Sequence, residues 1–452
     1  MRAASFLHDI LSTLFDRRTY AGVFVKDAPI EDQCRDLLSS KGEVSSNRLA
    51  ASLIAHYQAL DPDARRRFFE FLNDELDVDA ATVVDAASAY AQDRSAKSLE
   101  RLQKVAEPSR QELLRRLNHV PGATADIVAM RTDLLKLLPD HPSLKRTDND
   151  FRHLFVSWFN RGFLVLRRIG WETPANILEK IIQYEAVHAI NDWDDLRRRL
   201  EPPDRRCFAF FHPAIPSEPL VFVEVALVKG IPDSIQDVLS DKREPLQPKD
   251  ADTAVFYSIS NCQTGLRGIS FGNSLIKQVV EDLSRDFPHL KTFVTLSPVP
   301  GFNAWMTSAS EDEDPAIRAL SGAAADSVAA GKPTADLESM SDTARALCAR
   351  YLTQERRPDG NPLDPVARFH LGNGAELHAI HALADVSVNG LRQSSGVMVN
   401  YLYALDEVEA NHEAFAAEHR IATSDAVRSL AKRNAKRAAR SAEAGGSEGA
   451  KS

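Results

Sequence analysis

Two side chains in this sequence are suited to acid–base chemistry. Ser297 ends an apolar run that begins at Phe293, and His370 lies between Phe369 and Leu371. A serine hydroxyl can hydrogen-bond a carboxylate, and an imidazole whose pKa is ordinarily near neutrality can deliver a proton. Two plainer interpretations remain open from the residues alone. Ser297 could cap a turn before Pro298, and His370 could be a hydrogen-bonded core residue.

A loop within residues 257–277 has a composition that favours anion binding. Three glycines stand between an expected strand and an expected helix: Gly265, Gly268 and Gly272. Glycine lets a backbone approach a ligand closely, and the first N–H groups of a helix attract anions. Arg267 and Lys277 would add charge for a pyrophosphate. The spacing matches neither a dinucleotide fingerprint nor a nucleotide P-loop, and a simple tight turn explains the glycines equally well.

Short strands are expected to position these residues. Four runs rich in valine and phenylalanine are bounded by turn residues, as strands are: Cys207 to Phe211, Leu220 to Leu227, Ala254 to Ser260 and Thr292 to Leu296. A helix from about Phe271 to Arg285 separates the last two. The pattern predicts a domain of mixed α/β type over residues 191–425.

The first half, residues 1–190, is expected to be an all-α helical bundle, which makes the fold class α+β overall. Asp61-Pro62, Pro108-Ser109 and Thr173-Pro174 each predict a helix start. A further helix is expected from about Asp150 to Ile169, ending at Gly170. Two stretches are interpreted as loose: a mobile surface insertion from Glu311 to Asp336, and a basic, disordered tail over residues 426–452.

Composition narrows the class of protein. The chain has 452 residues, of which 44% are hydrophobic and 26% charged, as in an ordinary soluble protein of two domains. A net charge of -9 argues against nucleic acid as a partner, and no apolar run approaches the roughly 20 residues that span a membrane. Residues 1–20 favour an amphipathic helix. The four cysteines form no CxxC pair, which favours a reducing, cytoplasmic location. No convincing metal cluster exists, since His378 and His381 form only a single pair.

The glycine loop resembles the pyrophosphate-binding segment of the acetyltransferase (GNAT) fold, in which a splayed strand and the next helix start hold coenzyme A. A wider resemblance, to the malonyl-CoA decarboxylase family, covers most of the second half. The matching stretches occur in family order: Phe256 to Ser260, Gly265 to Gly268, Leu275 to Lys277, Leu296 to Phe302, Leu363 to Val366, Phe369 to Leu371 and Asn373 to Ala375. Upstream, His212 to Leu220, and Glu185 to His188 with Trp193, also match.

This resemblance implies an acetyltransferase-like (GNAT) catalytic domain that converts malonyl-CoA to acetyl-CoA and carbon dioxide. Ser297 and His370 match the family's catalytic serine and histidine. The segment that matches the malonyl-CoA-binding loop consists of Arg267, Gly268, Ile269, Ser270, Phe271, Gly272 and Asn273. Animal members carry an acidic residue at the position of Ser270, so a carboxylate role there is not expected. The family also implies a homo-oligomer, a dimer or tetramer formed through the helical half.

The chemistry needs neither a metal nor an organic cofactor, because the thioester already activates the α-carbon for decarboxylation. Two other functions use the same fold and loop. An acyl-CoA N-acyltransferase would need an amine acceptor, and a non-catalytic malonyl-CoA sensor would leave its ligand intact.

Overall fold

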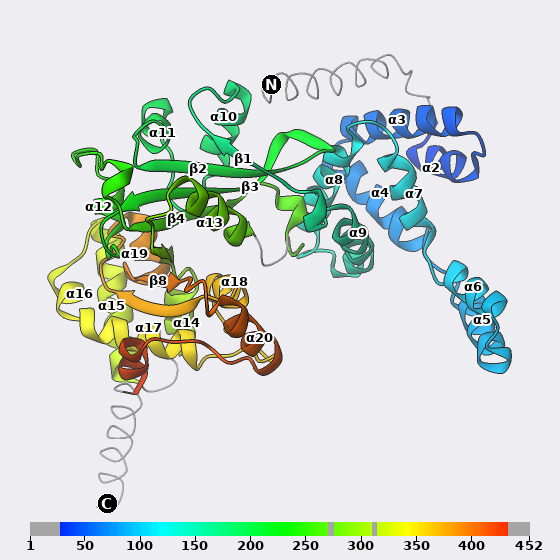
Figure 1. Ribbon diagram of the computed structural model, residues 1–452. Coiled ribbons are helices and arrows are strands. Elements are labelled where there is room, and N and C mark those ends of the chain that lie inside the picture. The colour runs from blue at the N-terminus through cyan, green and yellow to red at the C-terminus, as the bar shows by residue number, and fades with distance from the viewer. Residues whose placement is uncertain (1–27, 270–274, 310–313, 433–452) are drawn as a thin grey trace, which may run out of the picture. The chain divides into compact units, whose positions relative to one another are not determined.

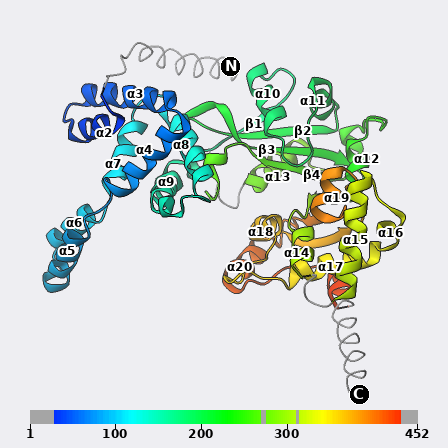
Figure 2. The same cartoon turned by 180° about the vertical axis from the view of Figure 1, so that it is seen from behind.

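The structure, a computed structural model, describes residues 28–269, 275–309 and 314–432 (Figure 1, and from behind in Figure 2). The helix expected over residues 1–20 and most of the basic tail lie outside this part of the chain. The chain divides into two compact units. The first contains Met1–Val165, Phe210–Val221 and Asn261–Gly272, and the second contains Leu166–Ala209, Phe222–Ser260 and Asn273–Ser452. The domain boundaries expected at residues 190 and 425 stay predictions.

The first unit is built mainly from helices. They are α2 (Ile30–Ser39), α3 (Glu43–Ala59), α4 (Pro62–Asp74), α5 (Ala80–Asp93), α6 (Ala96–Val105), α7 (Ser109–Asn118), α8 (Ala123–Leu137) and α9 (Lys145–Trp158), with short 3-10 turns at Pro142–Leu144, Arg161–Phe163 and Thr264–Leu266. The helix starts predicted at Pro62 and Ser109 are confirmed. Asp61 caps α4 by accepting a 2.8 Å hydrogen bond from the backbone N–H of Ala64. Tyr57, Phe68 and Phe69 stack in the core below it.

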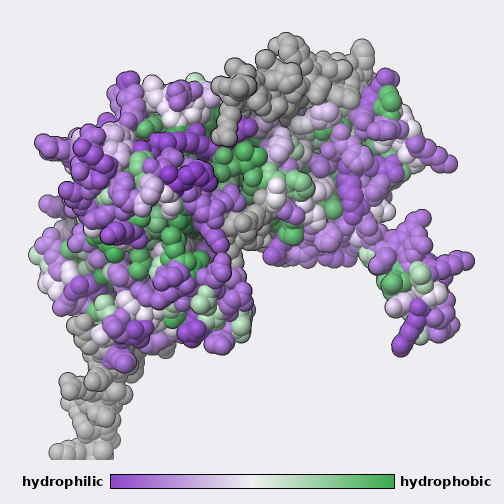
Figure 3. Space-filling model, in the orientation of Figure 1, coloured by the Kyte–Doolittle hydropathy of each residue, from purple (hydrophilic) through white to green (hydrophobic). Residues whose placement is uncertain are grey.

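Helices α5 and α6 form a hairpin that extends away from the other helices of its unit (Figure 1). They pack on each other, and the side chains buried in them are only those of Ala86 and Ser98. Figure 3 shows that the surface of this hairpin is mostly hydrophilic, with small apolar areas. Val84 is 65% exposed. The hairpin therefore contributes little to the core of the first unit.

The second unit is organised around the sheet. Its helices are α10 (Ala175–Tyr184), α11 (Trp193–Leu200), α12 (Ile235–Leu239), α13 (Leu275–Asp286), α14 (Phe302–Ala309), α15 (Pro315–Ala330), α16 (Ala335–Ser339), α17 (Ser341–Thr353), α18 (Pro365–Gly372), α19 (Val388–Ser394) and α20 (Val408–Glu418). The helix start predicted at Thr173-Pro174 is confirmed by α10. Residues 425–432 are also helical.

The sheet has eight strands: β1 (Val165–Ile169), β2 (Arg205–His212), β3 (Ile215–Val228), β4 (Thr253–Asn261), β5 (Thr292–Thr295), β6 (Ser297–Pro298), β7 (Glu376–His381) and β8 (Met398–Leu402). The order is β1-β2-β3-β4-β5-β8-β6, and β7 also pairs with β8. The four strands predicted from valine- and phenylalanine-rich runs correspond to β2, β3, β4 and β5. Together with the helical first unit, this mixed sheet confirms the α+β class.

Strands β4 and β5 separate near the candidate site. They pair in parallel from Thr253↔Thr292 to Phe256↔Thr295, and the Leu296 N–H still donates to the Phe256 carbonyl at 3.0 Å. Beyond that point β4 continues to Asn261, whereas the segment after β5 becomes β6 and pairs with β8. This separation is the splayed arrangement expected from the resemblance to the acetyltransferase fold. It places Ser297 directly after the last shared hydrogen bond.

Two predictions of secondary structure are wrong. The helix expected to continue to Ile169 ends at Trp158, and Val165–Ile169 forms strand β1 instead. The turn around Asn160 and Gly162 interrupts the helix, and the branched residues that follow pair with β2. The insertion expected to be mobile contains α15, a helix of 16 residues that begins after the Asp314 cap and ends at Gly331 with φ +67°. Its alanine-rich composition reflects close packing of small residues, since Ala323 and Ala324 are buried.

Candidate active site

Ser297 and His370 are brought together inside the second unit. Ser297 lies on β6 opposite Val399 of β8, and His370 lies in the last turn of α18. Asp364 caps the start of α18 by accepting 2.9 Å hydrogen bonds from the N–H groups of Val366 and Ala367. The Ser297 Oγ and His370 Nε2 atoms are 3.1 Å apart, and both residues are buried. A β-strand and a capped helix therefore hold the pair in one geometry.

The surrounding hydrogen bonds assign the proton on the imidazole. The single Ser297 hydroxyl proton is donated to the Thr295 Oγ1 at 2.8 Å. His370 must then donate from Nε2 to Ser297, which leaves Nδ1 as an acceptor. The Tyr403 hydroxyl lies 2.8 Å from Nδ1 and donates to it. Tyr403 thus selects the tautomer whose N–H points at Ser297.

The imidazole is neutral. Burial lowers the pKa of His370 to about 3, because it removes the hydration that stabilises the charged form. The ring stacks on Tyr401, with centroids 4.6 Å apart and planes 21° apart. The lowered pKa of His370 differs from the near-neutral pKa expected from the sequence. The proton available at this site is the N–H of a neutral imidazole, and Ser297 is not deprotonated by its partner.

A pocket reaches Tyr403 from the surface of the second unit. Its volume is about 50 Å³, and it is lined by residues of α13, by Asn373 and Tyr403, and by the start of α20. Lys277 lines it and forms a 3.1 Å ion pair with Glu409. The Asn373 Oδ1 atom is buried and has no hydrogen-bond partner in the described part of the chain. The pocket therefore offers an ammonium, an amide and a phenol beside the Ser297–His370 pair.

The described part of the glycine loop belongs to the first unit, where α8 holds it. Arg131, 2% exposed, donates to the carbonyls of Gly265 at 2.7 Å and Arg267 at 3.0 Å, and its Nε donates to Asp148 at 2.8 Å. A Cβ on Gly265 would lie 2.0 Å from the Val128 carbonyl oxygen. Gly265 therefore serves close packing against α8, not close approach of a ligand.

The structure describes three residues of the predicted malonyl-CoA-binding loop. Arg267 is exposed, Gly268 has a φ of +79°, which favours glycine, and Ile269 is buried. Ser270, Phe271, Gly272 and Asn273 lie outside the described residues. The Ser297–His370 pair belongs to the second unit, so the loop and the pair are described separately.

Sequence reasoning missed several residues of the site. Thr295 accepts from Ser297, and its Oγ1 also accepts from the Tyr401 N–H at 3.2 Å. Tyr403 lies outside the stretches that carry the resemblance, and no role was predicted for it. The period-2 spacing of Thr295 with Ser297, and of Tyr401 with Tyr403, was the available signal, since alternate strand residues face the same side.

The described residues contain no group of three or more His, Cys, Asp or Glu side chains suited to a metal ion. His378 lies 3.1 Å from a Glu376 oxygen, and His381 hydrogen-bonds Asn400 at 2.5 Å. The four cysteines are separate buried thiols. Among the helices of the described residues, none has the length and apolar character to cross a membrane.

An α+β architecture with a buried serine–histidine pair beside a pocket defines a candidate enzyme. Comparison with known proteins identifies the family. Residues 162–441 match the malonyl-CoA decarboxylase C-terminal domain, and residues 76–159 match the malonyl-CoA decarboxylase N-terminal domain. The chain belongs to the malonyl-CoA decarboxylase family, a family of carboxy-lyases.

Solved structures agree over nearly the whole chain. A malonyl-CoA decarboxylase from Rhodopseudomonas palustris is 52% identical, with a TM-score of 0.82 over 88% of this chain and 98% of that chain. One from Agrobacterium vitis is 50% identical, with a TM-score of 0.83 over 89% and 99%. The mitochondrial malonyl-CoA decarboxylase of Anser anser anser is 33% identical over 428 residues, which are 86% of this chain and 84% of the relative.

Proposed function

We propose that this protein converts malonyl-CoA to acetyl-CoA and carbon dioxide, with Ser297 and His370 as the catalytic residues and without a metal or organic cofactor. The observation that carries the proposal is the 3.1 Å contact between Ser297 Oγ and His370 Nε2, in a buried site of a malonyl-CoA decarboxylase family member. Arg267, Gly268, Ile269, Ser270, Phe271, Gly272 and Asn273 are proposed to bind the coenzyme A part of the substrate.

The reaction breaks the bond between the malonyl carboxylate and the α-carbon. The electron pair of that bond moves onto the α-carbon and the thioester oxygen, forming an enolate, and the carboxylate leaves as carbon dioxide. The enolate carbon then takes a proton and becomes the methyl group of acetyl-CoA. Because the thioester accepts the charge, the protein has to orient the carboxylate, stabilise the enolate and supply one proton.

Each of these tasks fits a neighbouring group. With substrate bound, the Ser297 hydroxyl would turn its proton from Thr295 Oγ1 to the malonyl carboxylate and hold that group out of the plane of the thioester. The neutral N–H of His370 is suited to protonate the enolate, and the Tyr403 hydroxyl at 2.8 Å can return a proton to the ring from the side of the pocket. Burial supports this scheme, since a dry site strengthens electrostatic stabilisation and keeps water from competing.

The proposal includes two features of the protein in the cell. We propose a homo-oligomer formed through the helical half, and a cytoplasmic location. Curated relatives from Anser anser anser, Rattus norvegicus and Mus musculus carry the word mitochondrial in their names. Oligomeric state is measured by light scattering of the full chain, and location by fractionation of the native host.

The test is turnover of malonyl-CoA by the purified full chain, without an amine and with EDTA present. Equal amounts of acetyl-CoA and carbon dioxide are expected. Release of free coenzyme A that needs an amine acceptor and gives no carbon dioxide would identify an N-acyltransferase instead, and binding without turnover would identify a sensor. Activity lost to the chelator contradicts the cofactor-free reaction. His370→Ala is expected to lower kcat at least a hundredfold, as loss of an acid–base group typically does, roughly 10²–10⁴-fold. His378→Ala, a histidine of β7 outside the site, is the control and keeps full activity.

A further inference from the structure

The second unit contains another pocket, at the end of α11 and beside α12. Its volume is about 150 Å³, and it shares no residue with the pocket at Tyr403. Four arginines line it: Arg198, Arg199, Arg205 and Arg243. The acidic residues of the lining are Asp195 and Asp241. Behind the lining, Asp204 bonds Arg243 and Glu224 bonds Arg199, so the guanidinium donors left for a ligand are chiefly those of Arg205 and Arg198. They face a space large enough for several water molecules.

Arg205 is the least compensated of the four. Its side chain is 3% exposed, and its guanidinium donates to the Val238 carbonyl and, at 3.5 Å, to the Asp204 carbonyl. The nearest carboxylate oxygen, on Asp204, is 4.0 Å away. That carboxylate is already held by two bonds from Arg243, at 2.5 and 3.1 Å. Burial lowers the pKa of Arg205, which shows how poorly its charge is solvated.

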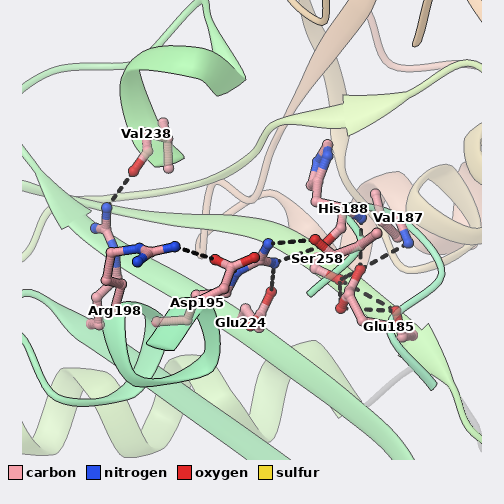
Figure 4. Close-up of polar contacts among 12 residues, drawn as sticks. Glu185, Val187, His188, Asp195, Arg198, Glu224, Val238 and Ser258 are labelled. Carbon is pink, nitrogen blue, oxygen red and sulfur yellow. Dashed lines mark hydrogen bonds and ion pairs between the residues drawn. The ribbon is translucent and has the colours of Figure 1, made fainter. Parts of the chain in front are cut away.

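Arg199 is fixed in the wall of the pocket by charged and backbone partners. It lies 3.2 Å from Glu224, 3.4 Å from Asp195, and donates to the backbone carbonyl of His188 at 2.8 Å. Figure 4 shows Glu224 and Asp195 beside each other, with His188 and Glu185 on the far side of Glu224. Burial, followed by the charge of Glu185, raises the pKa of Glu224 to about 8. The Glu224 carboxylate in turn raises the pKa of Arg199, so the two groups form a buried ion pair at 3.2 Å.

Arg198 stands at the mouth of the pocket. Its side chain is 52% exposed and lies 3.6 Å from Asp195 (Figure 4). Guanidinium groups present paired N–H donors that match the oxygens of phosphate and carboxylate groups. We propose that this pocket is a binding site for a small polyvalent oxyanion, distinct from the decarboxylation site. Arg205 and Arg199 form its floor and Arg198 closes over the ligand.

The size of the pocket and its donors define the ligand class. A space of about 150 Å³ suits inorganic phosphate, a terminal phosphoryl group or a small dicarboxylate. Phosphoryl and dicarboxylate ligands share the chemistry of two or more anionic oxygens. Titration with phosphate and with succinate in parallel distinguishes them.

The experiment uses the full chain and isothermal titration calorimetry, with inorganic phosphate added while sodium chloride holds the ionic strength constant. Saturable binding of one anion per chain is expected for phosphate, succinate or both. Arg198→Gln is expected to weaken binding roughly fivefold, the equivalent of one exposed charge pair. Arg198→Glu is expected to abolish it, because a carboxylate at the mouth repels the ligand. These variants are expected to fold, because the Arg198 side chain is half exposed.

Arg197→Gln is the matched control. Arg197 is the neighbouring residue on α11, its side chain is 51% exposed, and it pairs with Glu201 without lining the pocket. It should bind the anion as the unchanged protein does. No saturable binding by either anion overturns the proposal. Unchanged affinity in Arg198→Glu also overturns it, because the ligand then binds elsewhere. An equal fall in affinity in Arg198→Gln and Arg197→Gln overturns it too, because the effect is then one of net charge alone.

Discussion

Removing the hydroxyl of Tyr403 should change the preferred tautomer of His370 while leaving the imidazole ring in place. In the structure the rings of Tyr403 and His370 have centroids 6.2 Å apart. Tyr403→Phe keeps this ring contact but deletes the hydroxyl donor 2.8 Å from Nδ1. A lost hydrogen bond costs about 1 kcal/mol, and a buried acceptor left without a partner costs about 1–3 kcal/mol. A combined effect of about 2 kcal/mol on the productive tautomer corresponds to a roughly thirtyfold fall in kcat.

The assay is steady-state release of carbon dioxide from malonyl-CoA, with kcat and KM determined separately. A fall in kcat with a much smaller change in KM indicates that the group acts on the transition state rather than on binding. Tyr401→Phe is the control. Tyr401 stacks on the same imidazole, but its hydroxyl is buried without a hydrogen-bond partner in the described part of the chain. Its removal should leave kcat unchanged and the protein equally or slightly more stable.

The reasoning is refuted if Tyr403→Phe keeps kcat within twofold of the unchanged protein, since the tautomer would then not depend on the phenol. It is refuted equally if Tyr401→Phe slows turnover as much, because packing against His370 would then explain both results.

Three further outcomes are expected. Ser297→Ala should lower kcat by about 10²-fold or more while the Kd for coenzyme A, measured by calorimetry, stays nearly constant. Gly265→Ala should destabilise the protein by about 1–3 kcal/mol in urea unfolding, because its Cβ would meet the Val128 carbonyl at 2.0 Å, and Gly322→Ala, with open space around it, should not. Acid should destabilise the fold: burial lowers the pKa of His370 to about 3, so the unfolded chain binds the proton first and stability is lost as pH falls below about 6.5. His370 accounts for about 2 kcal/mol of this loss at pH 5, and urea unfolding across pH should show a loss smaller by that amount in His370→Gln. His188, whose pKa is lowered by burial to about 4, contributes to the loss in both proteins.

Local signals predicted much of the fold. The Asp61 cap and the Pro62 start predicted α4, and the valine- and phenylalanine-rich run near Phe256 predicted β4, because caps and apolar patterns act within a few residues. Strand β1 was missed because an apolar segment next to a helix extends the same pattern, and only pairing with β2 distinguishes the two. The helix α15 was missed because alanine and serine are common in loops and in close-packed helices alike.

The candidate site needed more than local signals. Ser297 and His370 were singled out through a family resemblance, since residue types alone favoured a turn residue and a core histidine. Their contact depends on the pairing of β6 with β8 and on the placement of α18, which are long-range features. The spacing of Tyr401 and Tyr403 was a local signal, but only the register of β8 places the Tyr403 hydroxyl at the imidazole. The lowered pKa of His370 likewise follows from burial, which only the packed structure supplies.

The hydrogen bonds from Arg131 to the glycine loop determine how this chain can be cut into fragments or recombined with its relatives. Arg131 falls in the segment that matches the family's N-terminal domain, and Gly265 and Arg267 fall in the segment that matches its C-terminal domain. A fragment beginning at residue 162 would carry the loop without the guanidinium that binds its carbonyls. A chimera that joins halves from two relatives would keep the loop in place only if both parents supplied compatible partners at this junction. Recombination during evolution is thus expected to have passed the two segments on together.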